Sequence, residues 1–249
     1  MITFSVRLAN RVIGVSALYD STRQFCKDYL TDEAPDLTVA VTQDDIDYER
    51  SKSIREAKLE GIPVQNYPDS YLETLAVYRK IADRMIELDT LLYHGSAISV
   101  DGQCYLFTAT SGTGKSTHTR LWREAFGNRA IMVNDDKPLL SITDAGVYAC
   151  GTPWNGKHFL GNNVVLPLKA ICILQRGAEN RIYPISASEA LPMLLQQSYR
   201  PNGALAMGKY MELIDKLSKG VSFYLLQCNM DPSAAVVAYE TMSAERKEE

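Results

Sequence analysis

The sequence has few features of secreted, membrane-spanning or nucleic-acid-binding proteins. Its five cysteines are scattered, odd in number and without a Cys-x-x-Cys pair, so we expect buried, reduced thiols rather than a disulfide framework or a metal site. No apolar run is long enough to span a membrane, and the first residues alternate in polarity instead of forming the apolar centre of a signal peptide. A formal net charge of −4 gives no general attraction for nucleic acid or an anionic membrane. These absences predict a cytoplasmic protein with neither partner.

The chain has the length and composition of a globular α/β protein. At 249 residues and 46% hydrophobic composition it can bury a large core. Apolar residues alternate along residues 2–8 and 37–41, which predicts a small β-containing N-terminal unit. We place a domain boundary near residue 66, with residues 1–66 of unknown role and residues 67–249 as the catalytic domain. The charged segment 42–58 is interpreted as a solvated connection, with a lid or a partner surface as alternatives.

The most informative segment is the glycine-rich stretch 107–117, which reads Phe-Thr-Ala-Thr-Ser-Gly-Thr-Gly-Lys-Ser-Thr. An apolar strand is predicted over 103–107 before it, and helical spacing follows over 119–126 up to Gly127. Small residues let consecutive backbone N–H groups point at phosphate oxygens, and the helix N-terminus adds positive potential. This predicts binding of ATP or another nucleoside triphosphate by Ser111, Gly112, Thr113, Gly114, Lys115, Ser116 and Thr117. Lys115 is expected to reach the β- and γ-phosphates and Ser116 to hold Mg²⁺.

One position departs from the general phosphate-loop pattern, which has glycine where this chain has Ala109. The methyl group is compatible with the loop only if the backbone there does not need a positive φ.

Two adjacent carboxylates, Asp135 and Asp136, follow the next apolar strand, predicted over 130–133. Ligands bind at the carboxyl ends of strands in open α/β sheets. One carboxylate is expected to hold Mg²⁺ with Ser116, and the other to accept the proton of an attacking hydroxyl. Asp101-Gly102, between two strand-like runs, is a hairpin signal.

Together, His94-Gly95, the hairpin, the loop and the aspartate pair resemble the catalytic core of the HPr kinase/phosphorylase family, and the loop is also similar to that of ATP-dependent phosphoenolpyruvate carboxykinase. The resemblance implies a P-loop core of mixed β-sheet with helices. It further implies that Asp135 is the catalytic base, that His94 contacts Asp135, and that Asp136 lies by the metal with Ser116. The arginine-rich substrate loop of HPr kinases is absent near residues 161–165, so the chain looks more like small HPr kinase-like proteins associated with modified-peptide gene clusters.

The sequence therefore predicts a Mg²⁺-dependent, ATP-using kinase whose catalytic residues are Asp135, His94 and Lys115. The expected acceptor is a hydroxyl, in a serine of a peptide or small protein, and self-association is possible by analogy with related kinases. A small-molecule kinase with the same site and a catalytically silent nucleotide sensor are the alternatives. Lys157 and Arg200 are weaker candidates for neutralising the transferred phosphate.

Overall fold

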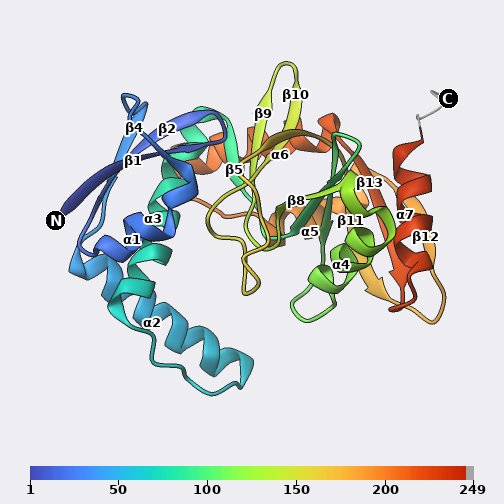
Figure 1. Cartoon of the computed structure of the whole chain (residues 1–249), viewed down its shortest axis with the longest axis horizontal. Coiled ribbons are helices and arrows are strands. Elements are labelled where there is room, and N and C mark those ends of the chain that lie inside the picture. The colour runs from blue at the N-terminus through green and yellow to red at the C-terminus, as the bar shows by residue number, and fades with distance from the viewer. Residues whose placement is uncertain (245–249) are drawn as a thin grey trace. The chain divides into compact units, whose positions relative to one another are not determined.

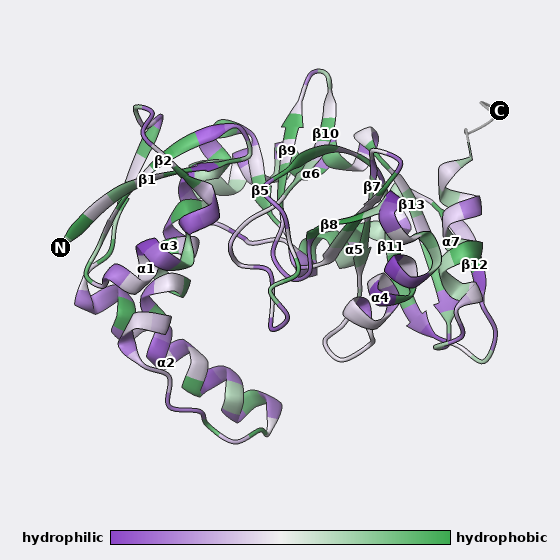
Figure 2. Ribbon diagram, viewed as in Figure 1, coloured by the Kyte–Doolittle hydropathy of each residue, from purple (hydrophilic) through white to green (hydrophobic). Residues whose placement is uncertain are grey.

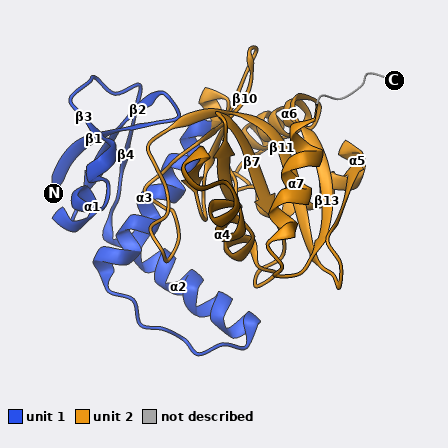
Figure 3. Ribbon diagram, turned by 45° about the vertical axis from the view of Figure 1, so that its right-hand side comes forward, with its two compact units in different colours: residues 1–85 blue, residues 86–249 orange. Residues whose placement is uncertain are grey.

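The computed structural model describes residues 1–244, which form two compact units. The first unit comprises residues 1–85 and the second begins at Ile86 (Figure 3). Each has a sheet and helices of its own, so the protein is a mixed α/β protein, as predicted.

The first unit is a four-stranded sheet with strand order β3-β1-β2-β4 and three helices. Its strands are β1 (Ile2–Leu8), β2 (Arg11–Ala17), β3 (Leu30–Thr31) and β4 (Leu37–Ala40), and its helices are α1 (Asp20–Phe25), α2 (Gln43–Glu60) and α3 (Asp69–Met85), with a 3-10 turn at Lys27–Tyr29. The alternation in 2–8 and 37–41 is thus strand periodicity, as predicted.

The charged segment 42–58 is a regular helix, not a solvated connection. Thr42 and Asp45 form a capping box at the start of α2, and Gly61 ends the helix in the left-handed region with φ 66°. Arg79 of α3 binds both Asp45 and Glu49 on α2, so part of the charge is used between the two helices.

The second unit contains a nine-stranded mixed sheet and four helices (Figure 1). The strands are β5 (Thr90–Leu92), β6 (Ser96–Val100), β7 (Gln103–Thr108), β8 (Ala130–Asn134), β9 (Leu139–Thr143), β10 (Gly146–Cys150), β11 (Val165–Arg176), β12 (Arg181–Ile185) and β13 (Ser222–Cys228). The helices are α4 (Lys115–Phe126), α5 (Ala187–Gln197), α6 (Ala204–Gly220) and α7 (Ser233–Ser243), with 3-10 turns at Ile86–Leu88 and Gly127–Arg129.

The long strand β11 joins two parts of this sheet. Its first residues pair with β10, which continues through β9 to β5, and the rest of it lies between β7 and β13. β7 and β13 are parallel to β11, whereas β6 is antiparallel to both β7 and β8. Strands β7, β8, β11 and β13 therefore run in the same direction and end at the same edge of the sheet.

Both faces of the central strands are covered, because residues of β11 alternate between two hydrophobic cores. Cys172 and Leu174 belong to the core that includes residues of α4 and α7, while Ile171 and Ile173 belong to the core with α5 and α6. Residues 170–174 of β11 are accordingly a continuous apolar run, as expected for a strand covered on both faces, whereas the strand ends in the polar residues Gln175 and Arg176 (Figure 2). The aromatic ring of Trp122 on α4 is fully buried against Tyr105 and Phe107.

The predicted hairpin between β6 and β7 is present. Asp101 and Gly102 have φ values of 53° and 81°, the pair of positive angles that a two-residue turn of this kind needs. The turn is also tied down, since Asp101 accepts hydrogen bonds from Arg129 and Tyr239.

The compact division falls after α3 rather than near residue 66, because α3 packs on α1, α2 and β4. All five cysteines are free, and all but Cys228 are buried. Within residues 1–244 we find no helix with both the length and the apolar character needed to cross a bilayer.

Candidate active site

The sequence-predicted site residues come together at the edge where the parallel strands end. The segment after β7 leads into α4, and the segment after β8 carries Asp135 and Asp136. Between β7 and β8 lies only β6, so the two segments are neighbours across one strand. Ligand sites of open α/β sheets lie at this edge.

The glycine-rich loop, residues 109–114, connects β7 to α4. Gly112 and Gly114 have φ values of 75° and 119°, which L-residues rarely adopt. Thr110 and Thr113 close the loop on itself, because the Thr113 N–H donates to the Thr110 carbonyl at 3.3 Å and their hydroxyls lie 3.0 Å apart. No side chain of the described residues caps α4 at Gly114, which leaves the start of this helix available to an anion.

Ala109 fits the loop despite the glycine of the general pattern. It is not among the residues with positive φ, and its side chain is buried in the core beside α4. A methyl group at this position therefore adds packing without backbone strain.

Lys115 begins α4 and is half-buried beside the loop, where its Nζ donates to the Ala109 carbonyl at 3.3 Å. Burial lowers the pKa of its ammonium group, and the charges of Asp136 and Asp135 raise it by less, so the net pKa is below its ordinary value. Lys115 is thus a partly desolvated cation whose charge additional anionic oxygens would stabilise.

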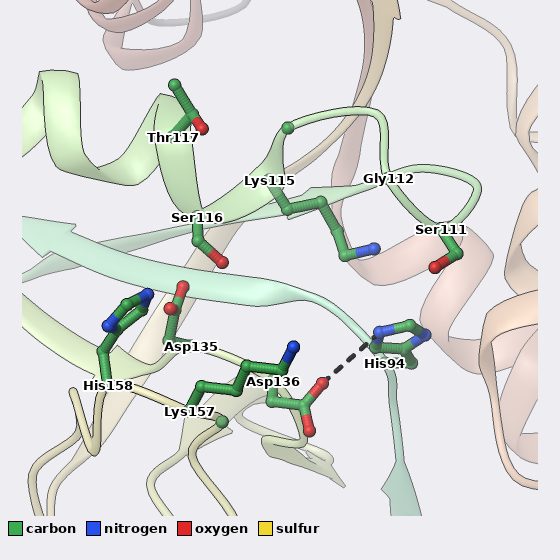
Figure 4. A pocket seen from close by; sticks show the side chains of 12 residues that line it. His94, Ser111, Gly112, Lys115, Ser116, Thr117, Asp135, Asp136, Lys157 and His158 are labelled. Atoms are coloured by element: carbon green, nitrogen blue, oxygen red, sulfur yellow. Dashed lines mark ion pairs between the residues drawn. The ribbon is translucent and has the colours of Figure 1, made fainter. Parts of the chain in front are cut away.

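Asp135 is a buried carboxylate, with 6% of its surface exposed. Its Oδ1 accepts a hydrogen bond of 2.6 Å from Ser96 on β6 and lies 3.5 Å from the hydroxyl of Thr119 on α4. In Figure 4 the hydroxyl of Ser116 and the carboxylate of Asp135 lie on the same side of the pocket. Asp135 is therefore held in place and presented toward Ser116.

Asp136 is more accessible and forms an ion pair with His94, whose Nε2 lies 3.4 Å from its Oδ1 (Figure 4). This corrects the pairing that the family resemblance implied, in which His94 contacts Asp135. Burial raises the pKa of the Asp136 carboxyl, but the hydrogen bond from His94 and the charges of nearby lysines outweigh it, so the net pKa lies below its ordinary value.

The backbone around His94 explains why the histidine meets Asp136. The Gly95 N–H donates to the Asp136 carbonyl at 3.0 Å, and the His94 N–H donates to Gln197 at 2.7 Å. A Cβ at Gly95 would lie 3.0 Å from the carbonyl oxygen of Phe107, so glycine lets the chain pass close to β7.

Asn134 is a positioning residue that the sequence analysis did not single out. It is fully buried, and its Oδ1 accepts hydrogen bonds from the N–H groups of Asp136 and Lys137 at 2.8 and 2.7 Å. Its Nδ2 donates to the hydroxyl of Thr152 at 2.9 Å. Asn134 thus fixes the turn that carries both carboxylates and ties it to the 151–161 loop. An Asn directly before two aspartates at a strand end was the available signal.

The 151–161 loop contributes a lysine and a histidine to the site. Lys157 and His158 are exposed and line the pocket (Figure 4), whereas Trp154 is buried and does not line it. Arg200 is exposed but does not line this pocket.

These groups surround one cavity of about 430 Å³, which we call the polar pocket. Its lining comprises His94, Ser111, Gly112, Gly114, Lys115, Ser116, Thr117, Asp135, Asp136, Gly156, Lys157 and His158. Every predicted site residue except Thr113 is therefore in its wall. The volume lies in the range of small-molecule sites.

The polar pocket fits a Mg²⁺ ion that arrives with a nucleotide better than a permanent metal centre. Within residues 1–244, no group of three or more His, Cys, Asp or Glu side chains could hold a metal. Mg²⁺ is commonly held by one or two carboxylates together with substrate phosphates and water. The hydroxyl of Ser116 and the carboxylate of Asp135 match that requirement.

Comparison with known families and proteins gives one clear assignment. The sequence model of the family described as "SynChlorMet cassette protein ScmC" matches residues 69–231, more than half of the chain. The chain belongs to this family. No curated protein matches it. Among solved structures, the HPr(Ser) kinase/phosphatase from Coxiella burnetii is similar at 12% identity and a TM-score of 0.33, over 61% of this chain and 92% of that one.

Proposed function

We propose that this protein is a Mg²⁺-dependent kinase that transfers the γ-phosphoryl group of ATP, or of another nucleoside triphosphate, to a hydroxyl group. The observation that carries the proposal is the meeting of Lys115, Ser116 and two differently placed carboxylates in the polar pocket. A site that only bound a nucleotide would not need a second, more accessible carboxylate paired with a histidine.

In this proposal the glycine-rich loop and the start of α4 hold the phosphates through backbone N–H groups. Lys115 neutralises the β- and γ-phosphates, and its reduced hydration favours that contact. Ser116 and Asp135 would hold Mg²⁺, and the bound ion would supply positive charge to offset the negative charge of the phosphates. Lys157, exposed on the 151–161 loop, adds a positive charge on the side of the polar pocket opposite Lys115 (Figure 4).

We assign the base to Asp136, which exchanges the roles that the resemblance implied for the two aspartates. Asp136 has a side chain that is 33% exposed, so an acceptor hydroxyl can reach it, whereas Asp135 is buried and already accepts a hydrogen bond from Ser96. Its lowered pKa keeps the carboxylate ionised at neutral pH. His94 orients it through the ion pair.

The transfer step is then a single displacement. The acceptor oxygen forms a bond to the γ-phosphorus while the bond between that phosphorus and the β–γ bridging oxygen breaks. Asp136 takes the hydroxyl proton, and the nucleoside diphosphate leaves with the bridging oxygen. We propose a serine of a peptide or small protein as the acceptor, on the basis of the family resemblance, with a small molecule as the alternative.

Binding and turnover of ATP test the proposal separately. Lys115→Ala removes a charged contact to phosphate and is expected to weaken Mg²⁺-dependent ATP binding by about 10- to 150-fold in isothermal titration, from about 1.5–3 kcal/mol per charged contact. Lys219→Ala, which removes the same charge from an exposed position on α6, is the control and should leave binding unchanged. Wild-type protein that binds no ATP in the presence of Mg²⁺ would overturn the proposal.

The exchange of roles has its own test in the two amide variants. Asp136→Asn is expected to keep ATP binding and to lower transfer of labelled phosphate to an array of serine-, threonine- and tyrosine-containing peptides and small alcohols by about 10²- to 10⁴-fold. Asp135→Asn is expected to weaken the Mg²⁺ dependence of binding as well. Unchanged transfer by Asp136→Asn would refute the assignment of the base.

A further inference from the structure

A second cavity, of about 450 Å³, lies on the other side of the glycine-rich loop, and we call it the apolar cavity. Its walls come from α4, the loop, the end of β11 and the end of β13. We propose that the apolar cavity holds the nucleoside half of the nucleotide whose phosphates lie at Lys115. This inference rests on the proposed function and adds the place of the base and sugar.

The two cavities share part of the loop as a common wall. Gly112, Gly114 and Thr117 line both of them. Among the described residues, chain neighbours apart, no atom lies within 4 Å of a Cβ built on Gly112, and a Cβ built on Gly114 would meet only the Thr117 side chain, at 3.9 Å. The outer side of the loop is therefore open. A phosphate chain lying along the backbone N–H groups can therefore have its γ-end in the polar pocket and its nucleoside end in the apolar cavity.

The chemistry of the two cavities differs in the way that the two halves of a nucleotide differ. The polar pocket is lined by lysines, carboxylates and histidines. The apolar cavity is lined by Leu121 and Leu174, which are almost completely buried, with Cys228 and Met230 at the end of β13. Flat nucleobases bury apolar faces, and ligand pockets combine such walls with a few polar groups.

Polar groups for orientation are present in the same wall. His118 is buried, with an exposed fraction of 3%, and its Nε2 accepts a hydrogen bond of 3.0 Å from Trp122. Its Nδ1 therefore carries the proton of the neutral ring, and this N–H has no hydrogen-bond partner among the described residues. Arg176, which donates to the Gly112 carbonyl at 2.6 Å, adds a positive charge at the cavity edge.

The far wall of the apolar cavity is held in place before any ligand arrives. Asn229 accepts from the Asp231 N–H and donates to the Ala178 carbonyl at 2.8 Å, while its own N–H donates to Asn180. The Gly177 N–H donates to the Cys228 carbonyl at 2.9 Å. These bonds join the ends of β11 and β13 into one preorganised surface, which lowers the entropy cost of binding.

Cys228 is a native probe for the occupant, because it is the one cysteine of the five that is not buried. We would follow its alkylation by N-ethylmaleimide at pH 8, with Cys228→Ser as the control that abolishes labelling. Saturating Mg²⁺–ATP is expected to slow labelling at least 10-fold, whereas saturating Mg²⁺–tripolyphosphate, which has no nucleoside, is expected to leave the rate unchanged. ATP that binds without protecting Cys228 would overturn the inference.

A second variant gives an independent readout. Met230 is 75% exposed, so Met230→Trp places an indole at the cavity mouth without disturbing the core. ATP is expected to change the fluorescence of this tryptophan and tripolyphosphate to leave it unchanged, in each case relative to the wild type. Binding of ATP with no such change contradicts the inference. If neither ATP nor tripolyphosphate binds, the proposed function itself is refuted. If ATP protects Cys228 but no phosphoryl transfer is found, the nucleoside site is supported and only the kinase activity is refuted.

Discussion

Acidification is expected to destabilise the second unit through one buried histidine. His118 lies in the aromatic cluster of α4, where its ring meets Phe107 edge-on with centroids 4.5 Å apart and its Nε2 accepts from Trp122. Burial lowers the pKa of His118 from 6.5 to about 3. The folded protein therefore keeps this ring neutral over a pH range in which the unfolded chain protonates it.

The magnitude follows from proton linkage. Because the folded pKa of His118 is depressed, the unfolded state binds the extra proton below pH 6.5, and stability falls as the pH falls. The slope is about 1.4 kcal/mol per pH unit once the unfolded ring is fully protonated, so the upper limit for acidification from pH 6.5 to 5.0 is about 2 kcal/mol. The effect ends near pH 3, where the folded ring protonates too.

Urea denaturation followed by tryptophan fluorescence measures this effect in the right part of the chain, since both tryptophans, Trp122 and Trp154, lie in the second unit. In His118→Gln the side-chain oxygen can still accept from Trp122, but nothing titrates there. The variant is therefore expected to lose less stability between pH 6.5 and 5.0 than the wild type, by up to about 2 kcal/mol. His158→Gln, at an exposed position, should behave like the wild type. Identical pH dependence in wild type and His118→Gln would refute the reasoning.

Two further substitutions each remove a buried side chain that accepts hydrogen bonds from backbone N–H groups, one in each unit. Asn134→Ala leaves the backbone N–H groups of Asp136 and Lys137 without their acceptor, and it is expected to cost about 2–4 kcal/mol of unfolding free energy in the same fluorescence assay. A loss below about 1 kcal/mol would contradict its positioning role. Glu73→Ala removes the buried carboxylate that accepts hydrogen bonds from Leu18, Tyr19 and Thr22. In hydrogen exchange, the free energy that protects the Leu18 and Tyr19 amides is expected to fall by about 3 kcal/mol, and by less in Glu73→Gln. Equal losses in the two variants would rule out the acceptor role.

Local signals predicted the centre of the second unit well. The strand before the glycine-rich loop, the helix that ends at Gly127 and the Asp101-Gly102 turn each follow from neighbouring residues, and the structure has all three. The sequence also predicted that the loop and the aspartate pair lie close together, because both segments follow strands that end at the same edge of the sheet.

Features that depend on long-range packing were not predicted. The helix over Gln43–Glu60 has little apolar periodicity, and its ionic contacts with Arg79 come from thirty or more residues away in the chain. Both aspartates line the polar pocket, and the pairing of His94 with Asp136 depends on which of the two carboxylates is held by β6 and which is left to meet the histidine. That choice is set by the hydrogen bond from Ser96 to Asp135, which sequence spacing does not reveal.

The position of α3 has a practical consequence for any attempt to dissect the chain. Leu72, Val77 and Ile81 of this helix are fully buried, and α3 packs on α1, α2 and β4 of the first unit. A fragment that starts at residue 67 would carry α3 away from those neighbours and expose an apolar stripe, which favours aggregation. A fragment that starts at Ile86 avoids this stripe, although it omits part of the region by which the family is recognised, since that region begins at residue 69. Expression trials should therefore take the cut between Met85 and Ile86 and treat α3 as part of the first unit.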